Sequence, residues 1–218
     1  MVQRQLRDLG ILVVQDARKC SHLAAPSILR TPKFVNALAY SPVIVNTDFL
    51  TQCLKKNELL DPKDFALVDE AAEERFSFSL GEAAAKAKQN KNKLLQGHNI
   101  YCIETIRGGF DAFKSIVDAN GGNCLLFRGR LSHKVQPQDS SDDGSDDEDP
   151  SETEVYLLSS VIPEHQKLWP RFRQIVQEIG KTPRIVRVDW LLDMAMSQEL
   201  HAADDYELNE DMVERAED

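Results

Sequence analysis

Two cations stand at the start of a segment that otherwise reads as an ordinary amphipathic helix. In residues 27–39, SILRTPKFVNALA, Thr31 and Pro32 predict a helix start, because threonine can cap free amides and proline suits the first helical position. Apolar residues then recur at helical spacing. Arg30 and Lys33 flank this start, although the positive end of a helix dipole favours acidic side chains. Helix stability alone does not explain them.

An anionic ligand would explain both cations. The first amides of a helix have no acceptor within the helix, and the dipole is positive there, so this end readily binds an anion. Lys33 adds a point charge suited to phosphate, and Arg30 offers a planar fork suited to a carboxylate. Thr31 is interpreted first as a helix cap and is kept as a second phosphate-binding candidate. The alternative is that Arg30 and Lys33 are solvated surface cations without a ligand.

The charge of the chain is concentrated in one segment. The protein has 218 residues, 42% of them hydrophobic, and a net charge of −10. Residues 139–154 hold nine acidic residues and no basic one, so the remainder is nearly neutral. A surface that coats nucleic acid needs a basic excess, and we therefore expect no direct sequence-specific binding of nucleic acid. We expect no membrane span either, since no apolar run approaches about 20 residues.

Enzymatic chemistry has little support in the sequence. The four cysteines and five histidines are scattered, without the spacing of a zinc site or of a nucleophile–base pair. Neither a P-loop nor the glycine pattern of a dinucleotide-binding turn occurs. We therefore predict no enzyme, no catalytic residue, no metal and no cofactor.

The same order of elements occurs twice along the chain, with short apolar strands between helices. Such alternation predicts an α/β fold with parallel sheets covered on both faces. In the first half we predict helices at 4–10, 31–40 and 47–57 and strands at 11–15, 21–25 and 42–46. In the second half we predict strands at 99–104, 124–127, 155–160 and 184–188 and helices at 108–122, 164–180 and 189–198. Pro170 should start or kink the helix at 164–180.

This repeat divides the chain into two domains, at 1–80 and 94–218. A linker that begins as helix joins them at 81–93, and a disordered acidic insert interrupts the second domain at about 137–154. The second half opens with a strand that the first half lacks. We therefore expect the opening strand of the first domain to be absent from this chain, with Met1 at a fragment or gene-model boundary.

Several stretches resemble the BRCT domain family. They are TDFLTQCL at 47–54, VDWLLDMA at 188–195, the ANGG turn at 119–122 and residues 20–39. Trp190 matches the tryptophan that marks the family's last helix, where the first half has Phe49 instead. The resemblance implies two tandem domains, each a four-stranded parallel sheet flanked by three helices. Within the family, the chain is most similar to the C-terminal pair of fungal genome-maintenance scaffolds with several BRCT domains.

The resemblance also implies a ligand. In such pairs the first domain binds phosphoserine, and here Lys33 would meet the phosphate and Arg30 the peptide's +3 position or terminal carboxylate. A Ser or Thr and a Gly after the first strand would also hold the phosphate, but they would precede Met1. Arg107 and Gly108 resemble the +3 contact region of the second domain. The implied partner is the phosphorylated C-terminal tail of a core histone of the 2A type, with phosphoserine four residues from a free carboxylate.

Other interpretations remain open beside this one. The implied setting is a DNA-damage-response scaffold in the nucleus that also contacts other repair proteins. A tandem module that assembles proteins without phosphate dependence is the main alternative, and a small-molecule-binding α/β domain is a weaker one. In the acidic insert, Ser140, Ser145 and Ser151 each precede an acidic residue by three positions, which suits an acid-directed kinase. The insert could equally be a solubilising loop, or a weak mimic of the phosphopeptide.

Overall fold

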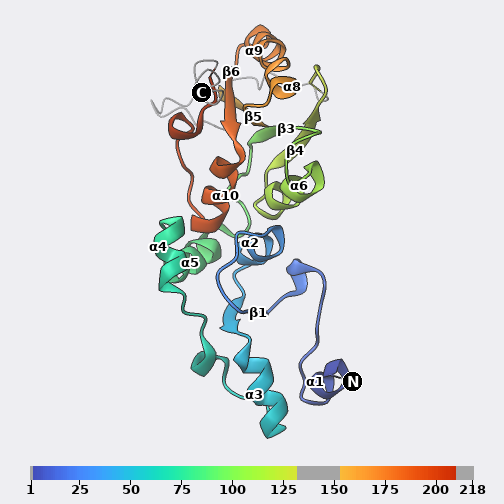
Figure 1. Cartoon of the computed structure of the whole chain (residues 1–218), viewed down its shortest axis with the longest axis vertical. Coiled ribbons are helices and arrows are strands. Elements are labelled where there is room, and N and C mark those ends of the chain that lie inside the picture. Colours follow the sequence, from blue (N-terminus) through green and yellow to red (C-terminus); the bar gives the residue numbers. More distant parts are fainter. Residues whose placement is uncertain (1, 132–152, 210–218) are drawn as a thin grey trace, which may run out of the picture. The chain divides into compact units, whose positions relative to one another are not determined.

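The protein was examined as a computed structural model that describes residues 2–131 and 153–209 (Figure 1). The chain divides into two compact units. The first comprises Met1–Lys91 with Ala195–Glu199, and the second comprises Asn92–Met194 with Leu200–Asp218. Most of the predicted acidic insert, at about 137–154, lies outside the described residues.

The first unit combines a two-stranded parallel sheet with helices. Its strands are β1 (His22–Ala25) and β2 (Val43–Asn46), with His22 opposite Val43. Its helices are α1 (Val2–Asp8), α2 (Pro32–Ala39), α3 (Asp48–Lys56), α4 (Glu70–Phe76) and α5 (Leu80–Asn90), with short 3-10 turns at Ala17–Lys19 and Pro62–Phe65. Val45, Phe49 and Cys53 form a small buried cluster between β2 and α3.

The prediction of a strand at 11–15 is wrong. These residues follow α1 but form no strand in the described structure, so the first unit has two described strands instead of the three expected. The apolar pattern of Ile11, Leu12, Val13 and Val14 suits a strand. A strand also needs a neighbour to accept and donate its ladder hydrogen bonds, and no described strand pairs with this segment.

The second unit contains a complete four-stranded parallel sheet. In spatial order its strands are β4 (Asn123–Phe127), β3 (Asn99–Ile103), β5 (Glu154–Ser159) and β6 (Thr182–Arg187). Its helices are α6 (Phe110–Ala119), α8 (Pro163–Gln166), α9 (Trp169–Glu178) and the part of α10 (Val188–Ser197) that precedes Ala195, and a 3-10 turn lies at Asp204–Tyr206. As predicted, Pro170 interrupts the helix expected at 164–180, and it sits at the start of α9.

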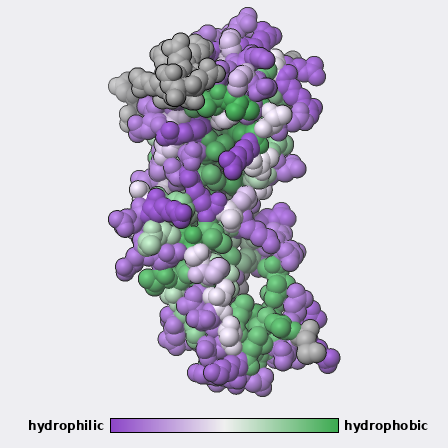
Figure 2. Space-filling view, in the orientation of Figure 1, coloured by the Kyte–Doolittle hydropathy of each residue, from purple (hydrophilic) through white to green (hydrophobic). Residues whose placement is uncertain are grey.

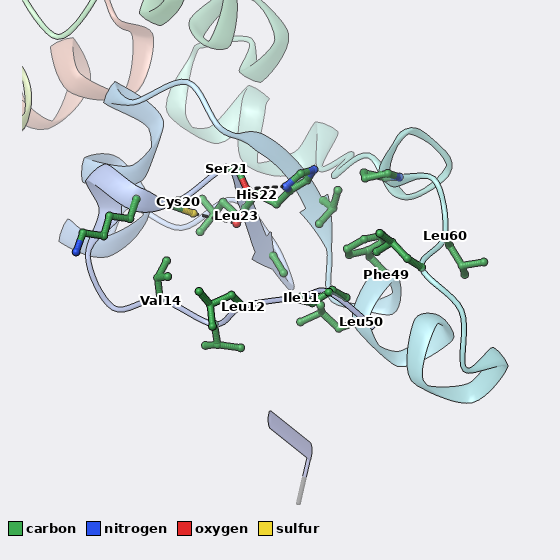
Figure 3. Close-up of a pocket in the computed structure, with 17 residues that line it drawn as sticks. Ile11, Leu12, Val14, Cys20, Ser21, His22, Leu23, Phe49, Leu50 and Leu60 are labelled. Carbon is green, nitrogen blue, oxygen red and sulfur yellow. Dashed lines mark hydrogen bonds between the residues drawn. The ribbon is translucent and has the colours of Figure 1, made fainter. Parts of the chain in front are cut away.

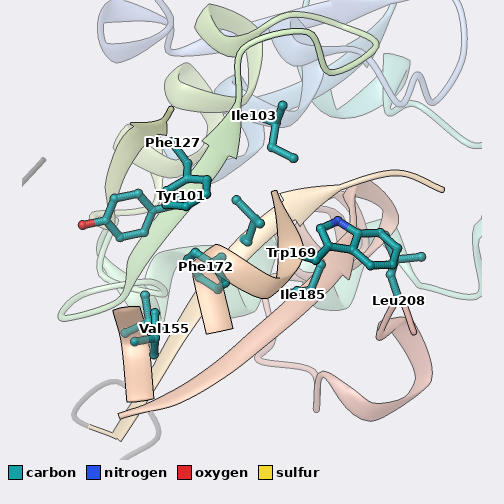
Figure 4. Packing of buried hydrophobic residues seen from close by; sticks show 10 residues of the cluster. Tyr101, Ile103, Phe127, Val155, Trp169, Phe172, Ile185 and Leu208 are labelled. Atoms are coloured by element: carbon teal, nitrogen blue, oxygen red, sulfur yellow. The ribbon is translucent and has the colours of Figure 1, made fainter. Parts of the chain in front are cut away.

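Helices cover both faces of this second sheet. On one face Tyr101, Phe127 and Ile185 pack against Trp169 and Phe172 of α9 (Figure 4). On the other face Tyr156 stacks on Trp190 of α10, with ring centroids 4.3 Å apart. Burial on both faces explains why the sequence of β5 is continuously apolar instead of alternating.

The described helices of the second unit begin and end close to their predicted positions. Trp190 is buried as expected, and its Nε1–H donates to the carbonyl of His201 at 3.0 Å. Within residues 2–131 and 153–209 no helix has the length and apolar character needed to cross a bilayer. The same residues contain no group of three or more His, Cys, Asp or Glu side chains that could hold a metal ion.

Candidate anion-binding site

The predicted site lies at the amino-terminal end of α2. Thr31 is the cap residue in an extended conformation, and its Oγ1 accepts a hydrogen bond from the Phe34 amide at 3.5 Å. The Thr31 carbonyl accepts the Val35 amide at 3.0 Å, which starts the helical pattern. Pro32 follows with no amide hydrogen. Thr31 therefore performs the capping role that its sequence position indicates.

Lys33 belongs to the first turn of α2 and is exposed to solvent. The opposite side of the helix is anchored, since Phe34, Val35, Ala37, Leu38 and Ala39 are all buried. The first turn of α2 carries no acidic side chain that would neutralise the dipole. The end of α2 thus presents a positive dipole, a backbone amide and an ammonium group to an approaching anion.

The loop before α2 is fastened to α4 by one carboxylate. Asp69 caps α4 by accepting the Ala72 amide on Oδ1 at 3.2 Å. Its Oδ2 accepts the backbone amide of Ile28 at 2.9 Å, although Ile28 is 41 residues earlier in the chain. Ile28 itself is buried. This double contact fixes the course of the chain two residues before Arg30.

Arg30 is half-buried and lies against an aromatic ring. Its guanidinium carbon is 5.8 Å from the centroid of Phe76, the last residue of α4. Arg75 also lies over the Phe76 ring, at 5.5 Å. An arginine at such a distance gains a cation–π contact and loses side-chain freedom. Arg30 is therefore partly pre-oriented, and Arg75 adds a second positive charge beside the same ring.

The second unit contains the other two predicted residues. Arg107 and Gly108 are exposed and form part of the turn between β3 and α6, where the Gly109 amide donates to the Ile106 carbonyl at 3.0 Å. Gly108 has a φ of +104°, and a Cβ there would meet the Phe113 ring at 3.1 Å. This turn requires glycine, which gives Gly108 a backbone role independent of any ligand.

The structure assembles Arg30, Thr31 and Lys33 at one helix end, and Arg107 with Gly108 in a turn of the other unit. Sequence reasoning missed Asp69, Arg75 and Phe76. The helix start at Asp69, followed by EAAEE, was readable as a cap and an acidic first turn. Its contact with Ile28 was not readable, because the two residues are distant in sequence.

Parallel sheets with crossover helices, repeated in two units, define a tandem of small α/β domains. Residues 2–67 match the family model of the "Regulator of Ty1 transposition protein 107 BRCT domain". The first of the two units is therefore similar to a BRCT domain. This agrees with the family and the fold class that the sequence predicted.

Relatives cover most of the chain. BRCT-containing protein 1 of Schizosaccharomyces pombe is 28% identical over 204 residues, which is 91% of this chain and 22% of that protein. Mediator of DNA damage checkpoint protein 1 of Homo sapiens is 31% identical over 134 residues, which is 62% of this chain and 6% of that protein. The chain thus spans less than a quarter of either relative.

Solved structures share the fold. The BRCT5–BRCT6 domains of S. pombe Brc1 superpose with a TM-score of 0.73 at 25% identity, covering 97% of this chain and 92% of theirs. Rtt107p, solved in complex with a phosphorylated histone, superposes with a TM-score of 0.64 at 17% identity, covering 95% of this chain and 85% of its own. Both structures match nearly the whole chain, so the likeness extends to both domains and not just to one.

Proposed function

We propose that this chain is a phosphoserine-peptide-binding module, not an enzyme, and that it serves a DNA-damage-response scaffold in the nucleus. Its ligand is the C-terminal tail of a phosphorylated core histone of the 2A type, with phosphoserine as the fourth residue from a free carboxylate. Other repair proteins would be recruited through the remainder of the scaffold. The proposal assigns phosphate to Lys33 and Thr31, and the +3 residue or carboxylate to Arg30, Arg107 and Gly108.

The end of α2 is the observation that carries this proposal. A capped helix start offers its dipole and an exposed Lys33, and Arg30 is held three residues before Lys33 against the Phe76 ring. A peptide that has a phosphate dianion and, a few residues later, a carboxylate offers one anionic group to each of these two cations. The phosphate suits the lysine and the carboxylate suits the arginine. Rtt107p, which has the same fold, has been solved in complex with a phosphorylated histone.

The test measures the affinity of the full chain for two peptides. Fluorescence anisotropy would measure the affinity for a histone-tail peptide with phosphoserine and for the same peptide with serine. We expect the phosphorylated peptide to bind more tightly by about 10- to 100-fold, the worth of one or two charge-assisted contacts. Equal affinities would reject the phosphopeptide function and favour phosphate-independent assembly.

The chain offers a matched control for Lys33. Thr31-Pro32-Lys33 begins α2, and Asp61-Pro62-Lys63 begins the 3-10 turn of the same unit with the same order of cap, proline and lysine. Lys33→Met should remove most of the preference for the phosphorylated peptide, whereas Lys63→Met should keep it. A similar loss in both variants would show only a general effect of charge.

A third peptide separates the role of Arg30 from that of Lys33. Amidation of the peptide's C-terminus removes the carboxylate and leaves the phosphate unchanged. Binding to the unaltered chain should weaken, and the Arg30→Gln variant should no longer distinguish the acid from the amide. An Arg30→Gln variant that still distinguishes them would assign the carboxylate to another residue.

A further inference from the structure

The β3–α6 turn of the second unit, which carries Arg107 and Gly108, begins where β3 leaves its neighbour β5. The pairing of the two strands runs as far as Cys102 and Leu158. Beyond that pair the chain follows residues 104–109 along the carboxyl edge of the sheet to the start of α6. A segment that has left its ladder keeps one conformation through other contacts, so the contacts of this turn decide where Arg107 lies.

One buried imidazole bridges this turn to the chain that follows β5. The Nε2 atom of His165, in α8, lies 3.0 Å from the Oγ1 atom of Thr105, and its Nδ1 atom lies 2.9 Å from the Oγ atom of Ser160. His165 is 1% exposed, whereas Thr105 lies at the surface. A buried ring whose two nitrogens both have hydroxyl partners holds those partners in place. The bridge therefore continues the connection between the two segments beyond the last ladder pair.

The Ser160 side of this bridge belongs to a packed part of the unit. The neighbouring Ser159 is buried, and its Oγ atom accepts a hydrogen bond from the Trp169 Nε1–H at 2.8 Å. The Leu168 amide donates to the His165 carbonyl at 3.0 Å, which joins His165 to the start of α9. Trp169 and His165 are both buried, although the surface over α9 is mostly hydrophilic in Figure 2. The turn is therefore tied to the packed interior of the unit and not to another surface loop.

The two ring nitrogens of His165 have different tasks. Desolvation lowers the pKa of His165 below its ordinary value of 6.5, so at neutral pH the ring has one N–H and one lone pair. The backbone of Thr105 also forms a hydrogen bond with the ring, and a carbonyl can only accept. This contact favours a proton on Nε2, which donates toward Thr105, and it leaves Nδ1 to accept the Ser160 hydroxyl.

We propose that His165 is a positioning residue, which holds the β3–α6 turn so that Arg107 and Gly108 meet the last residue of the peptide ligand. His165 acts through Thr105, since its burial keeps it from contact with a ligand. The buried Ile106 anchors the middle of the turn, and the bridge to Thr105 anchors its start. Because hydrogen bonds within the turn close it, a shift of Thr105 moves Arg107 with it. This inference rests on the proposed function, since it concerns the same peptide.

Two substitutions of His165 separate its two contacts. An asparagine amide extends about as far as Nδ1 of a histidine, and a glutamine amide extends about as far as Nε2. His165→Gln should therefore keep the contact with Thr105 and lose the one with Ser160, whereas His165→Asn should do the reverse. Both substitutions remove the ring from the same buried place, so a purely structural effect of that loss should appear in both variants.

His22 of the first unit offers a matched control. Its Nδ1 atom lies 3.0 Å from the Oγ atom of Ser21, much as His165 lies beside Ser160, and both residues line a groove beside β1 (Figure 3). The serine partner of His22 is the adjacent residue, so this pair joins no two distant segments. His22→Asn should leave the β3–α6 turn and peptide binding unaltered. A loss equal to that in His165→Asn would count against the proposal.

The first measurement needs no ligand. NMR-detected hydrogen exchange of the full chain follows the amides of Ile106 and Gly109, which donate to carbonyls at 3.3 and 3.0 Å, with the amides of β6 as the reference for the whole unit. Both should exchange about tenfold faster in His165→Asn, the effect of one lost hydrogen bond, and at a nearly unaltered rate in His165→Gln. Thr105→Val, which removes one exposed hydroxyl, should speed both several-fold. Equal rates in the two His165 variants, or unaltered rates in Thr105→Val, would overturn the proposal.

The second measurement is the preference for a complete peptide. Fluorescence anisotropy compares a phosphopeptide that ends three residues after phosphoserine with one that lacks the last residue. His165→Asn should lower the preference for the longer peptide by about two- to fivefold, the worth of an exposed ionic contact, and His165→Gln should restore most of it. The preference for phosphoserine over serine should persist in both, since Lys33 and Thr31 are unaltered. A loosened turn with an unaltered preference for the longer peptide would overturn the proposal and leave the phosphopeptide function standing. Equal affinities of the unaltered chain for phosphoserine and serine peptides would instead reject the proposed function, and this inference with it.

Discussion

Asp69 accepts the backbone amide of Ile28 at 2.9 Å, so a residue that caps α4 also holds the loop that leads into α2. The two residues belong to different segments of the first unit. Their hydrogen bond sets where the chain turns toward Arg30, Thr31 and Lys33. The geometry of the candidate site therefore depends on a residue outside it.

Replacement of Asp69 with alanine tests this dependence. Asp69→Ala removes a helix cap and leaves the part-buried Ile28 amide without its acceptor, which should cost about 1–3 kcal/mol of unfolding free energy. The variant should also bind phosphopeptide several-fold more weakly. Asp61→Ala is the control, because Asp61 caps the Pro62–Phe65 turn and holds no distant loop within the described part of the chain. Denaturant titration and anisotropy give the two results, and equal losses in both variants would contradict the loop's role.

Replacement of Phe76 should weaken the binding of the peptide's carboxylate more than the binding of its phosphate. Phe76→Ala removes the ring beneath Arg30, and we expect a two- to fivefold loss of affinity for the free-acid peptide, the worth of an exposed cation–π contact. The amidated peptide should lose less. Phe78→Ala removes a ring of similar burial that has no arginine over it in the described part of the chain. A loss that is equal for acid and amide would indicate a general packing effect.

His165 should make the second unit sensitive to acid. It is buried, and its ring nitrogens meet the hydroxyls of Thr105 at 3.0 Å and Ser160 at 2.9 Å. Desolvation lowers the pKa of His165 below the 6.5 that it has in an unfolded chain. Between these two values the unfolded chain binds the proton more strongly, so stability should fall as pH drops below about 6.5, by up to about 1.4 kcal/mol per pH unit.

The His165→Gln variant isolates this contribution. Urea titrations at pH 7.5 and 5.5 should show a smaller loss of stability in His165→Gln than in the unaltered chain. His22 is an exposed histidine of the first unit, and His22→Gln should show the loss seen in the unaltered chain. A pH dependence unchanged by His165→Gln would show that the ring is not kept neutral by burial.

Alanine substitutions at Gly121 and Gly129 should distinguish the stability cost of backbone strain from the additional cost of steric overlap. Both have positive φ, at +80° and +83°, so alanine at either should cost about 1–3 kcal/mol. A Cβ at Gly121 would also lie 2.3 Å from the Asn92 carbonyl oxygen, whereas one at Gly129 meets nothing within 4 Å. Gly121→Ala should therefore lower the melting temperature clearly more than Gly129→Ala does. Equal shifts would mean that the segment around Asn92 moves away freely.

Strands were predicted most reliably from the sequence where the neighbouring strands that pair with them also lie within the described chain. The strands of the second unit were found because each has neighbours that use its pattern. Residues 11–15 have the same apolar pattern but no neighbouring strand in the described structure, and there the prediction failed. Helix α4, which is short and mostly polar, was missed because its stability depends on the Asp69 cap and on packing, not on an apolar face.

In the candidate site, too, the sequence could predict only the residues that lie close together along the chain. Arg30, Thr31 and Lys33 are close in sequence, and a helix start converts that spacing directly into proximity. Asp69, Arg75 and Phe76 reach the site only through tertiary structure. A single sequence contains no local pattern that joins positions some 40 residues apart.

The strand order of the second unit also governs the timing of synthesis. The ribosome completes β4 about 20 residues after β3, but it completes β5 only about 50 residues after β3, because most of the acidic segment lies between β4 and β5. At roughly 5–20 residues per second, one edge of the central strand stays open for about 3–10 s. A shorter connection between β4 and β5 would therefore let the sheet close sooner after synthesis.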